Sequence, residues 1–108
     1  MNVIETVQKL ATTEQKNAQL ISSYGDYVLH PESKTIIKEA LKRELSQQQK
    51  TLTENISRIL IEHELYTILS EADTTATQEY LELATGALEQ YREQKEQLRV
   101  IEKTMRHL

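Results

Sequence analysis

The sequence predicts an all-α protein, an antiparallel three-helix bundle in which the second and third helices form one long hairpin. Apolar residues recur at helical spacing over two long stretches of the chain, which favours helices that each bury one face. The chain contains one Pro and two Gly, so few positions can interrupt a helix. Turn-forming residues gather around Gly25 and in the range Ser70–Thr75, and they divide the chain into three helical segments.

The first segment, from Met1 to about Tyr24, is predicted to be the weakest helix. Asn2 and Glu5 have capping-box spacing, which satisfies backbone N–H groups at a helix start. The polar run Thr12–Asn17 interrupts the apolar positions of this helix, so its centre contributes little to a core. Gly25 is expected to end the helix, because glycine adopts the left-handed conformation that is common after helix C-termini.

This first helix is expected to fold back onto the second helix about His30. Positions equally far from His30 then meet, so Val7 lies near Leu52 and Val3 lies near Ile56. The contact covers the part of the hairpin that is remote from its tip. The tip itself stays uncovered.

The second helix is predicted to begin at Pro31 and to continue without a helix breaker until the turn that starts at Ser70. Proline suits a first helical position because its missing N–H needs no partner there, and Glu32 favours the positive end of the helix dipole. The spacing of the apolar positions averages near eleven residues per three turns, which predicts a straight or slightly right-handed helix. The predicted seam consists of Ile37, Leu41, Leu45, Gln48, Leu52, Ile56, Ile59, His63 and Tyr66.

The third helix is predicted to start after a cap within Asp73–Thr75 and to end within a few residues of Leu108. Gly86 lies inside this helix among small residues, which would let a bulky partner side chain approach closely. Apolar residues recur at intervals of four and three, as in a seam buried against another helix. The predicted seam consists of Tyr80, Ala84, Ala87, Tyr91, Gln94, Leu98, Ile101, Met105 and Leu108.

Folding these two helices about Glu71–Ala72 aligns the two seams. Leu45 then faces Leu98, and Gln48 faces Gln94. A buried glutamine pair is tolerated because each amide both donates and accepts a hydrogen bond, and it disfavours slipped registers. The alternative is that both glutamines point outward into solvent.

Composition favours one domain that spans residues 1–108. Hydrophobic residues make up 38% of the chain without any Phe or Trp, so the core must consist mainly of small aliphatic side chains, which suits narrow helix–helix seams. The net charge of −4 implies no general attraction to nucleic acid or anionic membranes. No apolar run is long enough for a membrane span and no secretory signal is recognised, so we expect a cytoplasmic protein.

No pattern typical of catalysis, of a cofactor or of a metal site is found, and the protein is predicted not to be an enzyme. The chain has no cysteine, no glycine-rich phosphate loop and no Glu-x-x-His pair. His63 falls on a seam, where it is expected to bond Tyr80 or a backbone carbonyl at the edge of the core. A metal ligand would need further His or carboxylate side chains at helical spacing.

The tip of the hairpin contains more apolar residues than one seam can bury, because they point in several directions. A contiguous exposed apolar patch usually marks an interface. A symmetric homodimer would cover this patch with the same patch of a second copy, so no other surface is needed. The predicted interface residues are Ile59, Leu60, Leu65, Tyr66, Leu69, Leu81 and Leu88.

Basic residues gather at the opposite end of the predicted hairpin, interleaved with Glu39, Glu44 and Glu102. This basic end could contact phosphates or an acidic protein surface. A solvated helix face is the simpler interpretation of the same residues. The basic end consists of Lys34, Lys38, Lys42, Arg43, Arg99, Lys103 and Arg106.

The sequence therefore predicts a small non-enzymatic protein–protein interaction module that self-associates through the hairpin tip. Its expected role is that of an adaptor, an assembly factor or a partner-specific inhibitor. We expect a homodimer and a protein partner, with no cofactor and no membrane. The alternative is a nucleic-acid-associated regulator that uses the basic end.

Overall fold

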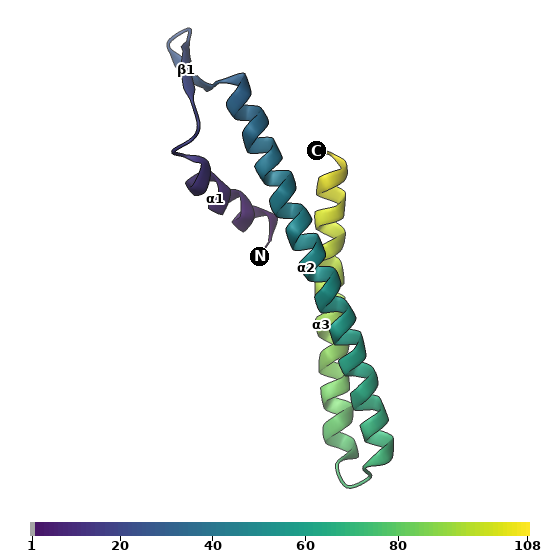
Figure 1. Cartoon of the computed structure of the whole chain (residues 1–108). Coiled ribbons are helices and arrows are strands. Elements are labelled where there is room, and N and C mark those ends of the chain that lie inside the picture. Colours follow the sequence, from purple (N-terminus) through teal and green to yellow (C-terminus); the bar gives the residue numbers. More distant parts are fainter. Residues whose placement is uncertain (1) are drawn as a thin grey trace. The chain divides into compact units, whose positions relative to one another are not determined.

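The computed structural model describes residues 2–108, and helices make up 79% of these residues. The predicted helical class is therefore confirmed, with one short sheet added (Figure 1). In chain order, the elements of the described part are α1 (Val3–Glu14), β1 (Leu20–Ser23), β2 (Asp26–Leu29), α2 (Pro31–Ala72) and α3 (Thr77–Arg106).

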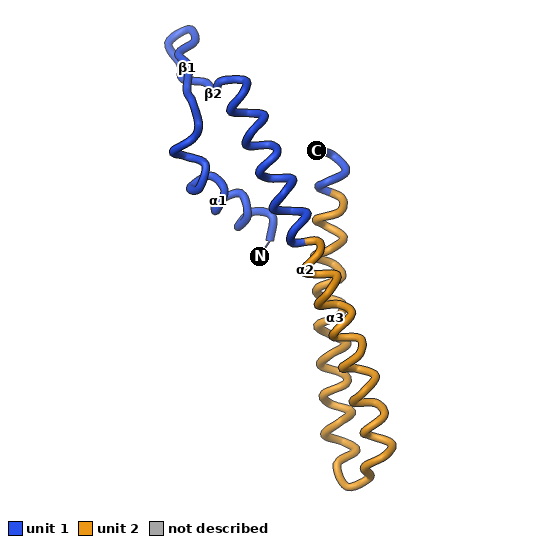
Figure 2. Tube along the Cα trace, viewed as in Figure 1, with its two compact units in different colours: residues 1–48, 104–108 blue, residues 49–103 orange. Residues whose placement is uncertain are grey.

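The chain forms two compact units, which are coloured separately in Figure 2. The first unit extends to Gln48 and includes Thr104–Leu108, and the second unit is Gln49–Lys103. The first unit therefore contains α1, the strands and the start of α2. The second contains the tip of the hairpin. That the whole chain is one domain stays a prediction.

Helix α1 begins as predicted but ends about ten residues early. The Asn2 side chain accepts a hydrogen bond of 2.8 Å from the backbone N–H of Glu5, which confirms Asn2 as the N-cap. The backbone N–H groups of Asn17 and Ala18 both donate to the Glu14 carbonyl at 3.0 Å, and the helix is not continued. Helix α1 therefore ends within the polar run Thr12–Asn17, which was expected to weaken it.

A β-hairpin occupies the stretch that was predicted to complete the first helix. Its antiparallel register pairs Leu20 with Leu29 and Ile21 with Val28. The central turn residues Tyr24 and Gly25 have φ values of 54° and 86°. Positive φ at both positions is typical of a type I′ hairpin turn, which follows the twist of the strands. Gly25 is left-handed as predicted, but it turns a hairpin instead of ending a helix.

The hairpin is attached to the start of α2 by two side chains. The His30 Nδ1 atom accepts a hydrogen bond of 3.2 Å from the Glu32 N–H, so this imidazole takes the role of an N-cap. The buried Ser33 hydroxyl accepts a bond of 2.9 Å from the Gln19 N–H. Pro31 is the first residue of α2, as predicted.

Helix α1 contacts α2 in antiparallel direction, but in a different register from the predicted one. Gln48 Nε2 donates to the hydroxyl of the buried Thr6 at 2.6 Å. Lys9 Nζ lies 3.3 Å from a Glu44 carboxylate oxygen. Residues of α1 thus face earlier positions of α2 than predicted. The predicted register assumed helical rise up to Tyr24, whereas residues 15–30 are not helical.

Helices α2 and α3 pack together as the predicted long hairpin, joined by residues 73–76. The predicted turn begins three residues too early, because Ser70 stays within α2 and its hydroxyl donates to the Thr67 carbonyl at 2.6 Å. Asp73 orders the loop, since its carboxylate accepts from the Thr75 hydroxyl at 2.6 Å and from the Thr75 N–H at 3.1 Å. The carboxylate therefore holds the loop instead of capping α3.

Both predicted seams are confirmed by burial, because every residue in them is buried or half-buried. The side-chain oxygens of Gln48 and Gln94 are buried and accept no hydrogen bond within the described residues. The alternative in which both glutamines point into solvent is therefore wrong. Their pairing with each other stays a prediction.

Candidate functional site

The tip of the second unit exposes a set of large apolar side chains, which we call the tip patch. It consists of Leu60, Ile61, Leu65, Ile68, Leu69, Leu81 and Leu83. Of the predicted interface residues, Leu60, Leu65, Leu69 and Leu81 belong to this patch, and Tyr66 and Leu88 are half-buried. Ile59 is 0% exposed, so it is a core residue and its assignment to the surface is corrected.

A ridge of three residues forms the centre of the tip patch on α2. Ile61, Leu65 and Ile68 follow one another at intervals of four and three, so they share one helix face. At 100° per residue, that face lies opposite the buried Ile59 and Ser70. Ile61 and Ile68 are apolar residues of the predicted tip, although they are absent from the predicted interface residues. Their spacing on the face opposite the seam is the signal that would have placed them in the interface.

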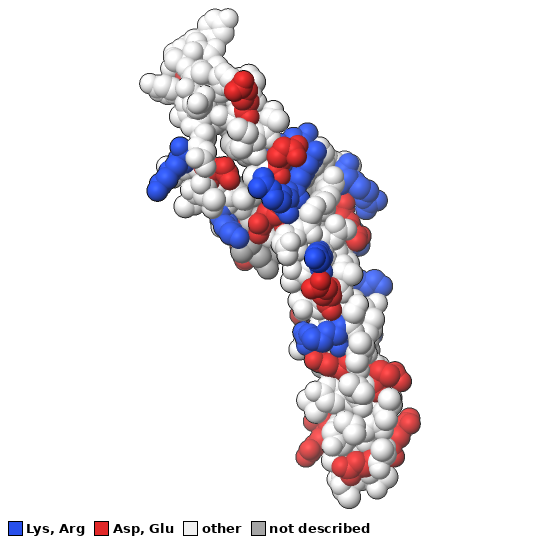
Figure 3. Space-filling view, viewed as in Figure 1, with Lys and Arg blue, Asp and Glu red and all other residues white. Residues whose placement is uncertain are grey.

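The tip patch is surrounded by negative charge without any basic residue. No Lys or Arg lies between Arg58 and Arg92 in the sequence. Figure 3 shows this end of the molecule in white and red without blue. Arg58, at the border, is bound to Glu62 by an ion pair of 2.6 Å. The acidic residues around the patch are Glu62, Glu64, Glu71, Asp73, Glu79 and Glu82.

The residues predicted as a basic end divide between the two units. Lys34, Lys38, Lys42, Arg43 and Arg106 belong to the first unit, and Arg99 and Lys103 belong to the second. All of them are exposed except Lys42, which is half-buried and lies 4.0 Å from Glu39. Their use by nucleic acid stays a prediction.

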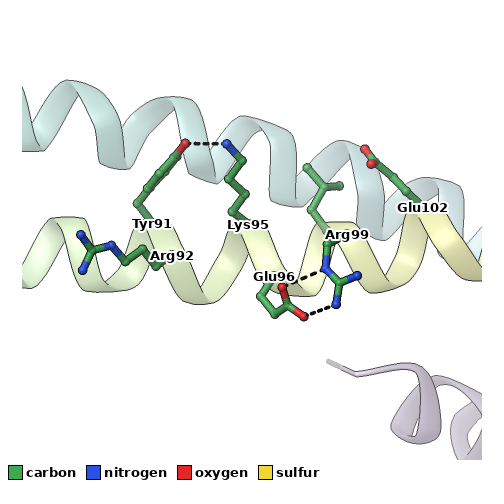
Figure 4. A pocket seen from close by; sticks show the side chains of 7 residues that line it. Tyr91, Arg92, Lys95, Glu96, Arg99 and Glu102 are labelled. Atoms are coloured by element: carbon green, nitrogen blue, oxygen red, sulfur yellow. Dashed lines mark hydrogen bonds and ion pairs between the residues drawn. The ribbon is translucent and has the colours of Figure 1, made fainter.

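A cavity of about 520 Å³ lies along the exposed side of α3 and is lined by Tyr91, Arg92, Lys95, Glu96, Leu98, Arg99 and Glu102 (Figure 4). Arg99 donates two hydrogen bonds to the Glu96 carboxylate, of 2.9 and 2.6 Å. This pairing lowers the pKa of Glu96 and raises the pKa of Arg99. The Lys95 ammonium donates to the Tyr91 hydroxyl at 2.9 Å, and this bond raises the pKa of Lys95. Of the cations that line the cavity, Arg99 is thus paired with a carboxylate, whereas Lys95 bonds an uncharged hydroxyl.

An apolar groove in the first unit was not predicted from the sequence. Its volume is about 230 Å³. The apolar lining residues are Val7, Leu10, Ala11 and Ala18 from α1 and the segment after it, and Ile37 and Leu41 from α2. Glu14 and Gln15 complete the lining. The groove depends on where α1 ends and how it lies on α2, so its two walls could not be assigned before the register was known.

The β-hairpin presents a further exposed apolar set, also missed because the segment was expected to be helical. It consists of Leu20, Ile21, Tyr24, Tyr27 and Val28. Between Lys16 and Glu32, the chain contains one acidic residue, Asp26, and one histidine, His30. An isolated two-stranded hairpin is only marginally stable in water.

No other kind of site is found within residues 2–108. No group of three or more His, Asp or Glu side chains among them is placed to hold a metal ion, and His63 is half-buried on the α2 seam. None of the described helices combines the length and apolar character that a membrane span requires. No protein-family model, curated protein or solved structure matches the chain.

Proposed function

We propose that this chain is a non-enzymatic protein–protein interaction module that self-associates through the tip patch. The observation that carries the proposal is the exposure of Ile61, Leu65 and Ile68 on a helix face that packs against no part of its own unit. A regularly spaced apolar ridge of this kind is the usual means by which one helix docks on another surface. Adaptors, assembly factors and partner-specific inhibitors all use such surfaces.

The test is the molar mass of the protein by light scattering across a wide range of concentration, with Leu65→Asp as the variant. Leu65 is 53% exposed, so the change removes an apolar contact without opening the core. The native chain should exceed the 12.5 kDa of one copy as concentration rises. Leu65→Asp should remain monomeric.

Ile36→Asp is the matched control, because Ile36 is 54% exposed on the same helix but lies outside the tip patch. It should associate like the native chain. A native protein that stays monomeric at every concentration contradicts self-association. Equal loss of association in both variants would show that the added charge itself prevents association, wherever it is placed on α2.

A further inference from the structure

We propose that the partner of the tip patch is the apolar groove between α1 and α2 of a second copy. This inference rests on the proposed self-association and names the surface that receives the tip. It differs from a contact between two tips in that every interface joins two different surfaces. Each surface is open to solvent, since Leu65 of the tip patch is 53% exposed and Val7 of the groove is 50% exposed.

The groove has the character that the tip ridge requires. Val7 and Leu10 form one wall, and Ile37 and Leu41 form the other. Val7 is 50% exposed, so apolar surface lies open to solvent at the groove. A docking ridge of Ile and Leu side chains would remove this surface from water, which is favourable by about 25 cal/mol per Å².

The charges beside the groove complement those beside the ridge. Lys34 and Lys38 are exposed and precede Ile37 and Leu41 by three positions, so they lie on the adjoining surface of α2. Glu14 is the acidic residue among those lining the groove and comes from α1. The tip offers Glu64 and Glu71, which have no Lys or Arg within four residues along the sequence, and these would face the two lysines.

Two tips, in contrast, repel each other. The segment from Ile59 to Tyr91 contains acidic residues but neither Lys nor Arg, so bringing two such segments together places like charges in proximity. Like charges set side by side across an interface disfavour that pairing. Charge therefore favours tip with groove over tip with tip.

A contact between two different surfaces has consequences for assembly. If two copies exchange tips reciprocally, the contacts close into a twofold dimer. If they do not close, the chain of copies always ends in one free tip and one free groove, and it grows. In either case, damage to the groove alone must abolish association.

The deciding experiment compares Val7→Asp with Ile36→Asp by light scattering over the concentration range in which the native chain associates. The two residues are almost equally exposed in the same unit, at 50% and 54%, but only Val7 lines the groove. Val7→Asp should be monomeric, and Ile36→Asp should behave like the native chain. Circular dichroism of both variants checks that helix content is unchanged.

Mixing Val7→Asp with Leu65→Asp adds a positive result. Each variant alone lacks one half of every contact, but together they retain one intact tip and one intact groove. The mixture should therefore associate where neither variant does. Added salt should weaken native association, because it screens the attraction between Glu and Lys, whereas it would strengthen a contact between two acidic tips.

The outcomes separate this inference from the proposed function. If Val7→Asp still associates while Leu65→Asp does not, the groove is not the receiving surface, although self-association through the tip stands. If Val7→Asp alone associates and recruits no Leu65→Asp when the two variants are mixed, tip-to-tip pairing replaces the inference. If the native chain never associates, the proposed function fails together with it.

Discussion

Thr6 and Gln48 show how one residue pair holds α1 on α2. The Thr6 hydroxyl donates to the Asn2 carbonyl at 2.9 Å and accepts from Gln48 Nε2 at 2.6 Å, with no exposed surface. Both capacities of the hydroxyl are thus used. The Gln48 oxygen, by contrast, is buried without a partner in the described residues. The amide nitrogen is therefore the part of Gln48 that fixes the contact.

Thr6→Val should destabilise the native state by about 1–3 kcal/mol, because the change keeps the shape but leaves the buried Gln48 amide without its acceptor. The measurement is urea denaturation followed by circular dichroism. Thr13→Val is the matched control, since the exposed Thr13 hydroxyl bonds only the Lys9 carbonyl of its own helix. A loss in Thr6→Val no larger than in the control would show that the bond contributes nothing.

The Glu96–Arg99 ion pair makes a contribution to the stability of the folded state that depends on pH. Arg99 lowers the pKa of Glu96 in the folded state, so Glu96 loses protons more readily when folded than when unfolded. The stabilisation is therefore present above the unfolded pKa and is lost as pH falls through the folded pKa. Because both groups are exposed, the effect is small and decreases with added salt.

Titration of the Glu96 carboxyl carbon by nuclear magnetic resonance measures this directly. The midpoint should lie below the ordinary range for glutamate and should rise in Arg99→Gln. An unchanged Glu96 midpoint in Arg99→Gln would contradict the assigned cause.

The two glycines show how the surrounding element decides the role of one residue type. Gly25 turns the β-hairpin at a φ of 86°, a conformation that other residues rarely adopt. Gly86 lies within α3, and a Cβ atom placed on it meets no atom within 4 Å. The close approach predicted for Gly86 is therefore not made. The buried small residues at this place are Ala84 and Ala87.

Alanine at the two glycines should have opposite effects on stability. Gly86→Ala should stabilise the protein by about 1 kcal/mol, because alanine is the better helix former and has room. Gly25→Ala should destabilise the hairpin by about 1–2 kcal/mol, since a Cβ opposes the left-handed conformation. Thermal unfolding of both variants measures the two signs. Destabilisation by Gly86→Ala would indicate that another copy packs on this side of α3.

At the scale of elements, the sequence predicts features that depend on helical periodicity. It misses the β-hairpin, where a short segment is compatible with more than one backbone structure. The α2 and α3 seams are correct because burial follows helical spacing. The β-hairpin is missed because Tyr24-Gly25 is compatible with a helix C-terminus as well as with a hairpin turn. Each strand is only four residues long, and neither Leu-Ile-Ser-Ser nor Asp-Tyr-Val-Leu alternates apolar with polar residues, so no strand pattern opposes a helical interpretation.

At the scale of the whole molecule, the candidate surfaces differ in how far the sequence predicts them. The tip patch follows from an excess of apolar residues, which composition shows without coordinates. The assignment of Ile59 to it is wrong because Ile59 also lies on the predicted α2 seam, and its side chain is buried there. The groove needs the register of α1 on α2, which in turn depends on the unpredicted hairpin.

The absence of basic residues between Arg58 and Arg92 also determines how the protein responds to proteases. Trypsin cuts after Lys and Arg, so a complete digest releases Ile59–Arg92 as one peptide that carries the entire tip patch. The loop of residues 73–76, an exposed connection of the kind that proteases usually nick first, offers trypsin no site. A protease that cuts after acidic residues meets Asp73 in this loop and Glu71 in the last turn of α2. Trypsin thus reports on the first unit and the far half of α3, and the acid-specific enzyme reports on the tip.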